Sequence, residues 1–395
     1  MSDDNHQPTS GAANGRRQQT GSNMRVLICA GGTGGGIYPA LAAATALRNR
    51  GLATENILWV GTQGEMEQTL VPRAGIRLET IVGGAIAGVP LHRKLINGSK
   101  LLLSIGKAWQ LVRQFRPDVM FMTGGYMAFP FTLACRWLGV PIAIYLPDVE
   151  PGQSIQFSLR YAQKVGATTD GSAQFVPADK LVVTGYPVRP ELRAAADLSK
   201  EEALASFDLQ PDRPTLMVFG GSRGAQAINR ALMNILPELL QTVQIIHISG
   251  TFTWDEVDTN AKKLPKALRE FYRPYPYLHE EMGHAFRAAD LVVARAGASM
   301  LGESPAFNLP SILVPLAWAW RYQKVNADYL CDSGTAVQLT DETLDEQLLP
   351  TIQSLLADPD RLAQMRQAAQ ALDVPNGAQN LAQLIENVAK TGGKE

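Results

Sequence analysis

The chain has 395 residues and a formal net charge of −1, with 46% hydrophobic and 18% charged residues. This length favours two domains over one, and the composition is typical of a globular enzyme with large cores. The near-zero charge argues against a nucleic-acid partner. The three cysteines lie far apart without metal-ligand spacing, so we expect buried free thiols in a reducing compartment and no metal site.

Residues 1–23 are polar and lack the apolar segment of a signal peptide. We therefore expect a disordered tail outside the fold. No apolar run approaches the ~20 residues that a membrane-spanning helix needs. These features predict a cytoplasmic protein with at most a surface attachment to a membrane.

In the first half, short apolar runs alternate with amphipathic stretches. Residues 25–30 (RVLICA) predict a buried strand, and residues 38–50 predict a helix with Pro39 in its first turn. Three further runs predict buried strands, at 56–61, 118–124 and 141–147. This alternation is typical of a parallel sheet with crossover helices.

The pattern breaks at residues 184–192 (TGYPVRPEL), and a charged, Ala-rich stretch follows. We therefore predict a linker over 188–213 between an N-terminal domain, 24–187, and a C-terminal domain, 214–375. The cycle restarts with strands predicted at 215–221, 243–250, 291–297 and 311–316. A C-terminal helix and tail are predicted over 376–395, with the helix at 379–390.

A glycine loop follows the first predicted strand of each half, GGTGGG at 31–36 and GGSRGA at 220–225. Two such units in tandem predict an α/β fold of two Rossmann-like parallel-sheet domains that face each other across a cleft. Ligands of such sheets bind beyond the carboxyl ends of the strands, where these loops lie. Bare backbone N–H groups at a helix N-terminus suit a diphosphate, although the glycines could serve only tight turns and close packing.

The loops do not match the common nucleotide motifs. GGTGGG does not fit GxGxxG in register, and Gly61-Thr62-Gln63 after the second strand offers no acidic residue to a nicotinamide ribose. No GxxxxGK[ST] motif for a nucleoside triphosphate occurs. A nucleotide-sugar diphosphate in one domain and a second phosphate-bearing substrate in the other fit better.

Several motifs in this order resemble the MurG glycosyltransferases: GGTGGGIYPALA, MTGGY, TGYPVRPE, GGSRGAQAIN, ARAGASMLGE and LPSILVPLAWAWRYQKVNA. The resemblance covers about residues 24–390. It implies a GT-B hexosyltransferase of peptidoglycan synthesis that needs no metal or other cofactor. Such an enzyme transfers N-acetylglucosamine, with inversion, from UDP-N-acetylglucosamine to the 4-hydroxyl of the muramoyl sugar of lipid I and forms lipid II.

The resemblance implies a donor site in the C-terminal half. Glu303 would accept hydrogen bonds from the ribose hydroxyls, Arg189 would lie near the diphosphate, and Gln323 would touch the sugar. Tyr322 replaces a second family glutamine, which leaves the sugar specificity open. A solvated helix charge at Glu303 and a linker arginine at Arg189 are the structural alternatives. The remaining donor candidates are Ser222, Gly221, Gly224 and His279, of which His279 could equally be a surface histidine.

The same resemblance implies that the N-terminal domain receives the acceptor diphosphate. The family loop normally reads GGTGGH, so Gly36 replaces a histidine that is a common candidate for the catalytic base. The acceptor candidates are Thr33, Gly34, Gly35, Gly36, Gly124, Gly125 and Tyr126.

A second departure from the family is YLPDVEPG at 145–152, where many members have HEQNAVPG. An inverting transfer needs a base near the attacking hydroxyl, and without a histidine at Gly36 the carboxylates of this loop are the best candidates. Our hypothesis is that Asp148 is the base and Glu150 the second candidate, with burial raising a carboxyl pKa toward neutrality. Alternatively, Asp148 binds sugar hydroxyls or caps a helix.

Residues 89–113 mix apolar side chains with basic ones, which are Arg93, Lys94, Lys100, Lys107 and Arg113. Such a helix could attract anionic lipid, or its apolar side could simply face the core. With the resemblance, we expect a peripheral protein at the cytoplasmic face of the cell membrane, with cell-wall or division proteins as further partners. The alternative functions are a GT-B enzyme with another lipid or small-molecule acceptor and a non-catalytic scaffold of cell-wall assembly.

Overall fold

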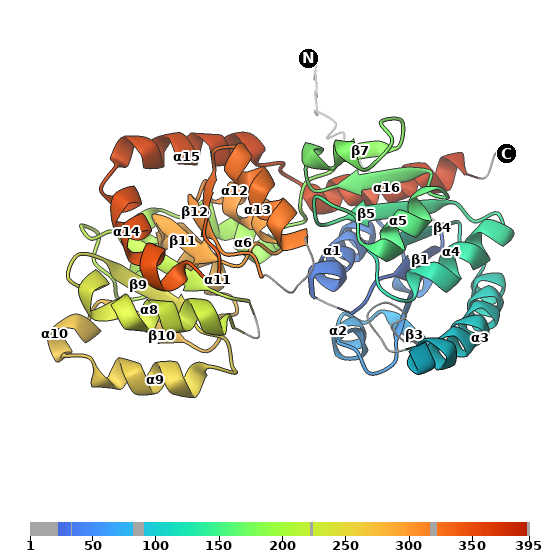
Figure 1. The fold of residues 1–395 in the computed structure, drawn as a ribbon. Coiled ribbons are helices and arrows are strands. Elements are labelled where there is room, and N and C mark those ends of the chain that lie inside the picture. Colours follow the sequence, from blue (N-terminus) through green and yellow to red (C-terminus); the bar gives the residue numbers. More distant parts are fainter. Residues whose placement is uncertain (1–22, 33, 82–90, 222–223, 317–321, 393–395) are drawn as a thin grey trace, which may run out of the picture.

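The computed structural model describes residues 23–32, 34–81, 91–221, 224–316 and 322–392, and over 91–102 it describes the backbone alone. Two parallel sheets organise this described chain, one in each of two domains (Figure 1). The first sheet has the strand order β3-β2-β1-β4-β5-β6-β7, and the second has the order β10-β9-β8-β11-β12-β13. The predicted α/β fold with two Rossmann-like parallel-sheet domains is confirmed. Of the predicted tail, only Asn23 lies within the described residues.

The first domain holds the longer sheet. Its strands are β1 (Val26–Cys29), β2 (Ile57–Thr62), β3 (Arg77–Ile81), β4 (Val119–Met122), β5 (Ile142–Leu146), β6 (Lys164–Ala167) and β7 (Leu181–Val183). Its helices are α1 (Gly34–Asn49), α2 (Glu67–Arg73), α3 (Leu91–Phe115), α4 (Ala128–Trp137) and α5 (Gln153–Leu159), with short 3₁₀ helices at Thr54–Asn56 and Asp170–Gln174. The predicted strands at 25–30, 56–61, 118–124 and 141–147 agree with β1, β2, β4 and β5 to within two residues at each end. Strands β3, β6 and β7 were not predicted. β3 and β7 are partly exposed and lack a continuous apolar run, and the four-residue β6 begins at an exposed lysine.

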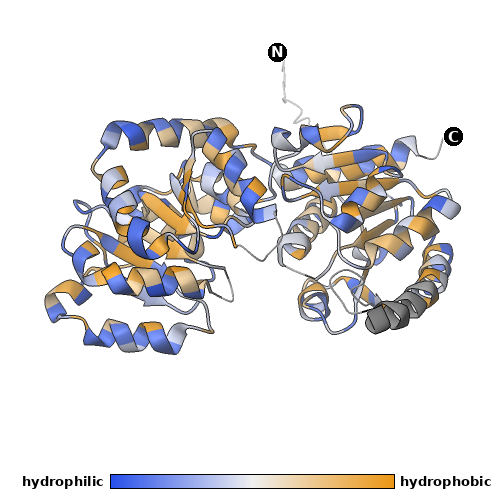
Figure 2. Cartoon of the chain, in the orientation of Figure 1, coloured by the Kyte–Doolittle hydropathy of each residue, from blue (hydrophilic) through white to orange (hydrophobic). Residues whose placement is uncertain are grey.

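The second domain repeats the plan with six strands. They are β8 (Thr215–Phe219), β9 (Gln244–Ile248), β10 (Tyr272–Tyr275), β11 (Leu291–Ala294), β12 (Ser311–Leu313) and β13 (Ala336–Gln338). Its helices are α6 (Pro190–Ala195), α7 (Lys200–Ala205), α8 (Gln226–Leu239), α9 (Trp254–Lys263), α10 (Lys266–Arg269), α11 (Met282–Ala288), α12 (Met300–Ala306), α13 (Tyr322–Asp332), α14 (Leu344–Leu356) and α15 (Pro359–Leu372). Figure 2 shows the hydrophobic strands of this sheet inside helices whose outer faces are hydrophilic.

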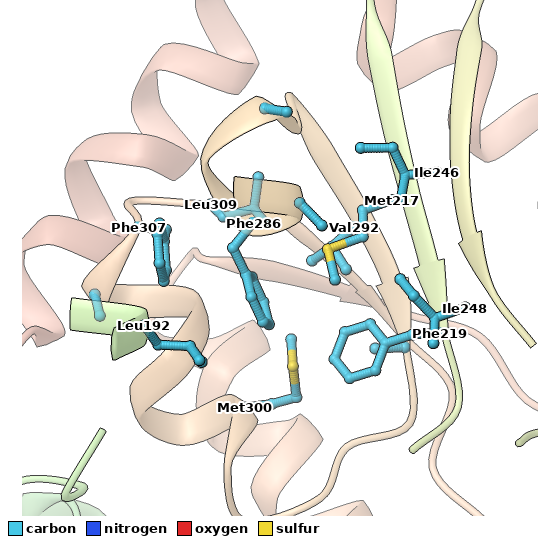
Figure 3. Close-up of a cluster of buried hydrophobic side chains, with 14 of the residues drawn as sticks. Leu192, Met217, Phe219, Ile246, Ile248, Phe286, Val292, Met300, Phe307 and Leu309 are labelled. Carbon is cyan, nitrogen blue, oxygen red and sulfur yellow. The ribbon is translucent and has the colours of Figure 1, made fainter. Parts of the chain in front are cut away.

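The predicted linker, 188–213, is instead part of the second domain. It contains α6 and α7, and both helices pack against α11. Leu192 of α6 is buried beside Phe286 of α11, whose ring stacks on Phe307 with 5.2 Å between centroids (Figure 3). Ser199 and Glu202 form a capping box at the start of α7, which was the sequence signal for a helix here. The Pro- and Ala-rich composition concealed that signal.

The chain returns to the first domain at its end, where α16 (Gly377–Thr391) packs on α1 and on β4, β5 and β6 (Figure 1). Leu381, Ile385 and Val388 of this helix are buried in the core of the first domain. The Arg50 guanidinium, just after α1, donates to Glu386 Oε1 at 2.8 Å and to Gln383 Oε1 at 2.6 Å. The predicted C-terminal helix therefore belongs structurally to the domain that begins the chain.

Candidate functional site

A buried carboxylate organises the first glycine loop. Glu67, which is fully buried, accepts hydrogen bonds from the backbone N–H of Thr62 at 2.8 Å and of Gly32 at 3.2 Å. A Cβ atom on Gly31 would overlap the Glu67 carboxylate, and one on Gly61 would lie 2.6 Å from Glu67 Cγ. Two glycines are therefore required by a side chain of the protein itself, and the Gly32 N–H is already in use.

The other glycines of this loop begin a helix. Helix α1 starts at Gly34, four residues before the predicted start, so Pro39 lies in its second turn and not in its first. The loop turns at Gly32, with a φ of 87°, which leaves Gly34 to Gly36 free to take up helical backbone. N–H groups of a first turn have no acceptor within their helix, so these glycines can offer donors to an anion. Thr33 lies outside the described residues.

The second acceptor loop, Thr123 to Tyr126, lies beside the first. Thr123 Oγ1 donates to the carbonyl of Gly36 at 2.9 Å. Gly124 and Gly125 have φ values of 110° and 93°, and a Cβ on Gly125 would lie 3.2 Å from the carbonyl oxygen of Gly31. The structure thus brings the predicted acceptor glycines together at one edge of the sheet, with the half-exposed Tyr126 next to them.

The loop after β5 carries the two candidate bases. Asp148 Oδ1 accepts a hydrogen bond from Asn326 Nδ2 of α13 at 2.8 Å. Burial raises the pKa of Asp148 above its ordinary value, and the hydrogen bond from Asn326 opposes this in part. Glu150 is buried as well. Because Gly152 is the N-cap of α5 and no side chain caps that helix, Asp148 does not act as a helix cap.

On the donor side, the charge of Arg189 acts on the carboxyl of Glu303. Glu303 is buried near the start of α12, so the alternative of a solvated helix charge is wrong. Burial raises the pKa of Glu303, while the charge of Arg189 and a hydrogen bond with Ser299 lower it. The charge of Arg189 also lowers the pKa of Tyr38 on α1, which burial raises. The charge of Arg189 therefore acts on Tyr38 of the first domain and on Glu303 of the second. Its Nη1 atom lies 3.6 Å from Glu191 Oε1.

The second glycine loop and its neighbours complete the predicted donor set. Gly221 and Gly224 have φ values of 83° and 82°, and a Cβ on Gly224 would overlap the Ser249 carbonyl oxygen. Gln323 Oε1 accepts from the N–H of Leu316 at 3.0 Å. His279 is exposed and lies edge-on to the ring of Tyr277, as a surface histidine would. Ser222 lies outside the described residues.

Sequence reasoning missed two residues of this region, Glu67 and Asn326. Glu67 reads as an ordinary acid in the first turn of a helix. Asn326 lies in the RYQKVNA motif, but no role was predicted for it. An amide beside apolar positions is a usable signal of a buried polar contact. Both act on residues that are distant in sequence.

Other features of the described residues lie away from this edge. A hollow of about 530 Å³ at the amino ends of β1 and β4 is lined by Arg25, Trp109, Gln110, Arg113, Gln114 and Arg116. Within the described ranges no group of three or more His, Cys, Asp or Glu residues is placed to hold a metal ion. In the same part of the chain, no helix has the length and apolarity needed to cross a membrane. Cys29 and Cys135 are free and buried, and Cys331 is free and partly buried.

Known proteins resemble the chain in both of its halves. Residues 26–167 match the glycosyltransferase family 28 N-terminal domain, and residues 215–381 match the C-terminal domain of that family. The UDP-N-acetylglucosamine–N-acetylmuramyl-(pentapeptide) pyrophosphoryl-undecaprenol N-acetylglucosamine transferase of Roseiflexus sp. (strain RS-1) is 36% identical, over 92% of this chain and 95% of the relative. The transferase of the same name from Halalkalibacterium halodurans is 34% identical, over 93% of this chain and 100% of the relative.

Solved structures show the same likeness. The crystal structure of Acinetobacter baumannii MurG has a TM-score of 0.75 and 27% identity, and the match covers 92% of this chain and 99% of that one. A UDP-GlcNAc 2-epimerase from Neisseria meningitidis, bound to UDP-GlcNAc, has a TM-score of 0.61 but only 12% identity. The second likeness therefore concerns the fold alone.

Proposed function

Because this chain belongs to the MurG family of N-acetylglucosamine transferases, we propose that it transfers N-acetylglucosamine from UDP-N-acetylglucosamine to lipid I and so forms lipid II. The observation that carries this function is the similarity to enzymes of that name over more than nine-tenths of the chain. This similarity disfavours the two alternative functions, which are a GT-B enzyme with another acceptor and a non-catalytic scaffold of cell-wall assembly. The roles of individual residues below are part of the proposal and are supported by the geometry of the site.

The second domain would bind the donor. The buried carboxylate of Glu303 can accept hydrogen bonds from the two ribose hydroxyls, and the guanidinium of Arg189 can pair with the diphosphate. Gly221 and Gly224 let the backbone of their loop approach the diphosphate, with Ser222 between them. The Leu316 N–H holds the oxygen of Gln323, which orients the amide, and its Nε2 would donate to the sugar.

The first domain would bind the acceptor diphosphate. The N–H groups of Gly34, Gly35 and Gly36 lie in the first turn, at the positive end of a 16-residue helix, and would donate to the diphosphate. Gly124 and Gly125 let a second stretch of backbone come close to the same place. An acceptor held there extends toward the loop after β5, which carries Asp148.

Asp148 would then act as the general base. Its carboxylate takes the proton of the 4-hydroxyl while that oxygen forms a bond to the anomeric carbon of N-acetylglucosamine. The bond from this carbon to the diphosphate oxygen breaks, and its electron pair leaves with UDP. Arg189 and the glycine-loop amides stabilise the charge that develops on the leaving diphosphate. Attack opposite the leaving group inverts the sugar carbon.

The substitution Asp148→Asn tests this assignment, because it keeps the shape of the side chain and removes the base. With a short-chain lipid I analogue, kcat should fall by roughly 10²- to 10⁴-fold. The KM for UDP-N-acetylglucosamine should stay within a few-fold, since Asp148 does not belong to the proposed donor contacts. Glu150→Gln tests the second candidate base on the same loop and should keep a higher kcat than Asp148→Asn. Near-normal turnover by Asp148→Asn at saturating substrates would refute the role of Asp148.

We further propose peripheral attachment at the cytoplasmic face of the membrane through the segment 89–113. In the described half of α3, Ala108 and Val112 are buried against the core, whereas Leu103 is 76% exposed. The Arg113 guanidinium lies over the Trp109 ring, 5.0 Å from its centroid. The side chains of Arg93, Lys94 and Lys100 lie outside the described residues. Association with cell-wall or division proteins stays a prediction.

Sedimentation with anionic liposomes tests this attachment. Replacing Arg93, Lys94 and Lys100 with Gln should lower binding by roughly 100-fold, because polybasic segments gain about 1 kcal/mol per charge near such a surface. A matched triple replacement of Lys262, Lys263 and Lys266 in the second domain should leave binding unchanged. Equal binding by both variants would refute this membrane surface.

A further inference from the structure

A loop of the first domain is docked into the second. Val149, between the two candidate bases, is 2% exposed, and its side chain belongs to the apolar cluster of the second domain that includes Ala296, Met300 and Ala327. Its carbonyl accepts a hydrogen bond from Ser172 Oγ at 2.9 Å, which ties the loop to its own domain. Asp148 is therefore anchored next to a residue that is packed into the donor-binding domain.

One amide of the second domain holds this loop. Asn326 of α13 is fully buried, and its Oδ1 accepts the N–H of Val149 at 3.0 Å. Its Nδ2 donates to Asp148 Oδ1 at 2.8 Å and to the Ala296 carbonyl at 3.1 Å. Both N–H groups and the oxygen of the amide are thus used, and the reversed amide would point its oxygen at two acceptors.

The Ala296 contact links this amide to the donor site. Ala296 lies in the loop after β11, which continues through Ser299 into α12 and Glu303. Asn326 therefore joins the backbone that carries the proposed ribose-binding carboxylate to the carboxylate proposed as the base.

We propose that Asn326 is a positioning residue: from the donor-binding domain, it orients the carboxylate of Asp148 so that this group can accept the proton of the acceptor hydroxyl. The base is therefore assembled only when the two domains are docked. The inference rests on the proposed role of Asp148. The hydrogen bond uses Oδ1, and Oδ2 accepts none from the residues that the structure describes, so it can face the acceptor hydroxyl.

Burial raises the pKa of Asp148, and the hydrogen bond from Asn326 is the interaction that opposes this rise. Burial raises the pKa of Tyr145 in β5 and of Tyr186 ahead of α6, and the charge of Asp148 raises both further, so these phenols stay neutral at working pH. Glu150 lies on the same loop, and Glu303 with Arg189 lies beyond Tyr186. A donor to the carboxylate favours its charged form.

The test is the pH profile of kcat/KM, measured on the full chain with UDP-N-acetylglucosamine and a short-chain lipid I analogue. In the wild-type enzyme the acidic limb reports the pKa of the base in the free enzyme. Asn326→Ala should move this limb upward by about one pH unit, because the charged form loses its donor. It should also lower kcat at least tenfold at pH values above the limb, with the KM for UDP-N-acetylglucosamine changed only a few-fold.

Tyr329→Phe is the matched control. It removes another hydrogen bond of α13 to the first domain, from Tyr329 Oη to Asp170 Oδ1 at 2.8 Å, and leaves Asp148 alone. The acidic limb of its kcat/KM profile should coincide with that of the wild type. Asn326→Leu, which is close to asparagine in size and has no donor, provides the same measurement if the alanine variant does not fold.

The variant Asp148→Asn distinguishes a failure of the inference about Asn326 from a failure of the proposed base. If that variant is inactive and the Asn326 variants keep the wild-type limb, Asn326 has only a structural role and the inference is overturned. If Asp148→Asn turns over normally, the proposed base is wrong, and the inference falls with it.

Discussion

At Gly31 and Gly61 the missing side chains make room for a carboxylate of the protein itself. The bare loop was expected to serve a diphosphate, and the structure divides it between two tasks. Gly31 makes room for Glu67 and Gly32 donates to it, while Gly34, Gly35 and Gly36 begin helix α1. Gly36 also lacks the histidine that the family loop normally carries, so this loop can bind an anion but offers no side chain to take a proton.

Glu67→Gln should destabilise the protein by about 1–3 kcal/mol, because the amide NH₂ would face one of two backbone N–H donors and leave it unsatisfied. Urea unfolding at neutral pH measures the change. Glu55→Gln, at an exposed acid of the same domain, should leave the unfolding midpoint in place. If both variants unfold at the wild-type midpoint, the carboxylate does not organise the loop.

At the scale of elements, a neutral histidine joins the strands and helix beneath the second glycine loop. His247 of β9 lies 3.0 Å from Asn229 Oδ1 of α8 and 2.7 Å from the Tyr272 hydroxyl of β10. Asn229 Nδ2 donates to the Ser249 carbonyl and to Thr253 Oγ1, so its oxygen is the acceptor and His247 Nε2 carries the proton. The Ser249 carbonyl is the atom that a Cβ on Gly224 would overlap.

This network should make stability depend on pH. Burial lowers the pKa of His247 to about 3, against an ordinary value of 6.5. Below pH 6.5 the His247 imidazole therefore binds a proton in the unfolded chain but stays neutral in the folded chain. The free energy of unfolding then falls as pH falls, by up to about 1.4 kcal/mol per pH unit. Urea unfolding at pH 7.5 and 5.5 measures the slope.

The variant His247→Gln should lose this component of the slope, whereas His279→Gln, at an exposed histidine, should keep it. The buried carboxyls of Asp148 and Glu303 have raised pKa values and act in the opposite direction. They are present in every variant and cancel in the comparison. A slope that is the same with and without His247 would contradict the assignment.

At the scale of the whole molecule, the domains exchange segments in both directions. The first domain inserts the loop around Val149 into the second, and the chain crosses back at its end to lay α16 on the first (Figure 1). The two crossings differ in kind. Helix α16 contributes a large apolar face and therefore stability, whereas the Val149 loop joins the two halves of the proposed site.

Ile385→Ala should lower the free energy of unfolding of the first domain by about 2–5 kcal/mol, the usual cost of emptying a buried aliphatic site. UDP binding should persist at denaturant concentrations where the first domain is already unfolded, because the second domain keeps its own core. Lys390→Ala, on the exposed side of α16, is the control. An unchanged transition in Ile385→Ala would show that α16 does not stabilise that domain.

Local patterns in the sequence determined the central strands, the two glycine loops, the fold class and the family, because buried parallel strands and tight loops leave continuous local signals. They did not reveal the packed helices α6 and α7, which resemble a linker, or the short or partly exposed strands β3, β6, β7, β10 and β13. Glu67 and Asn326 were decided by the tertiary structure alone. Each contacts a backbone brought close by the fold, Glu67 across 35 residues and Asn326 across 177, and no local periodicity encodes such a contact.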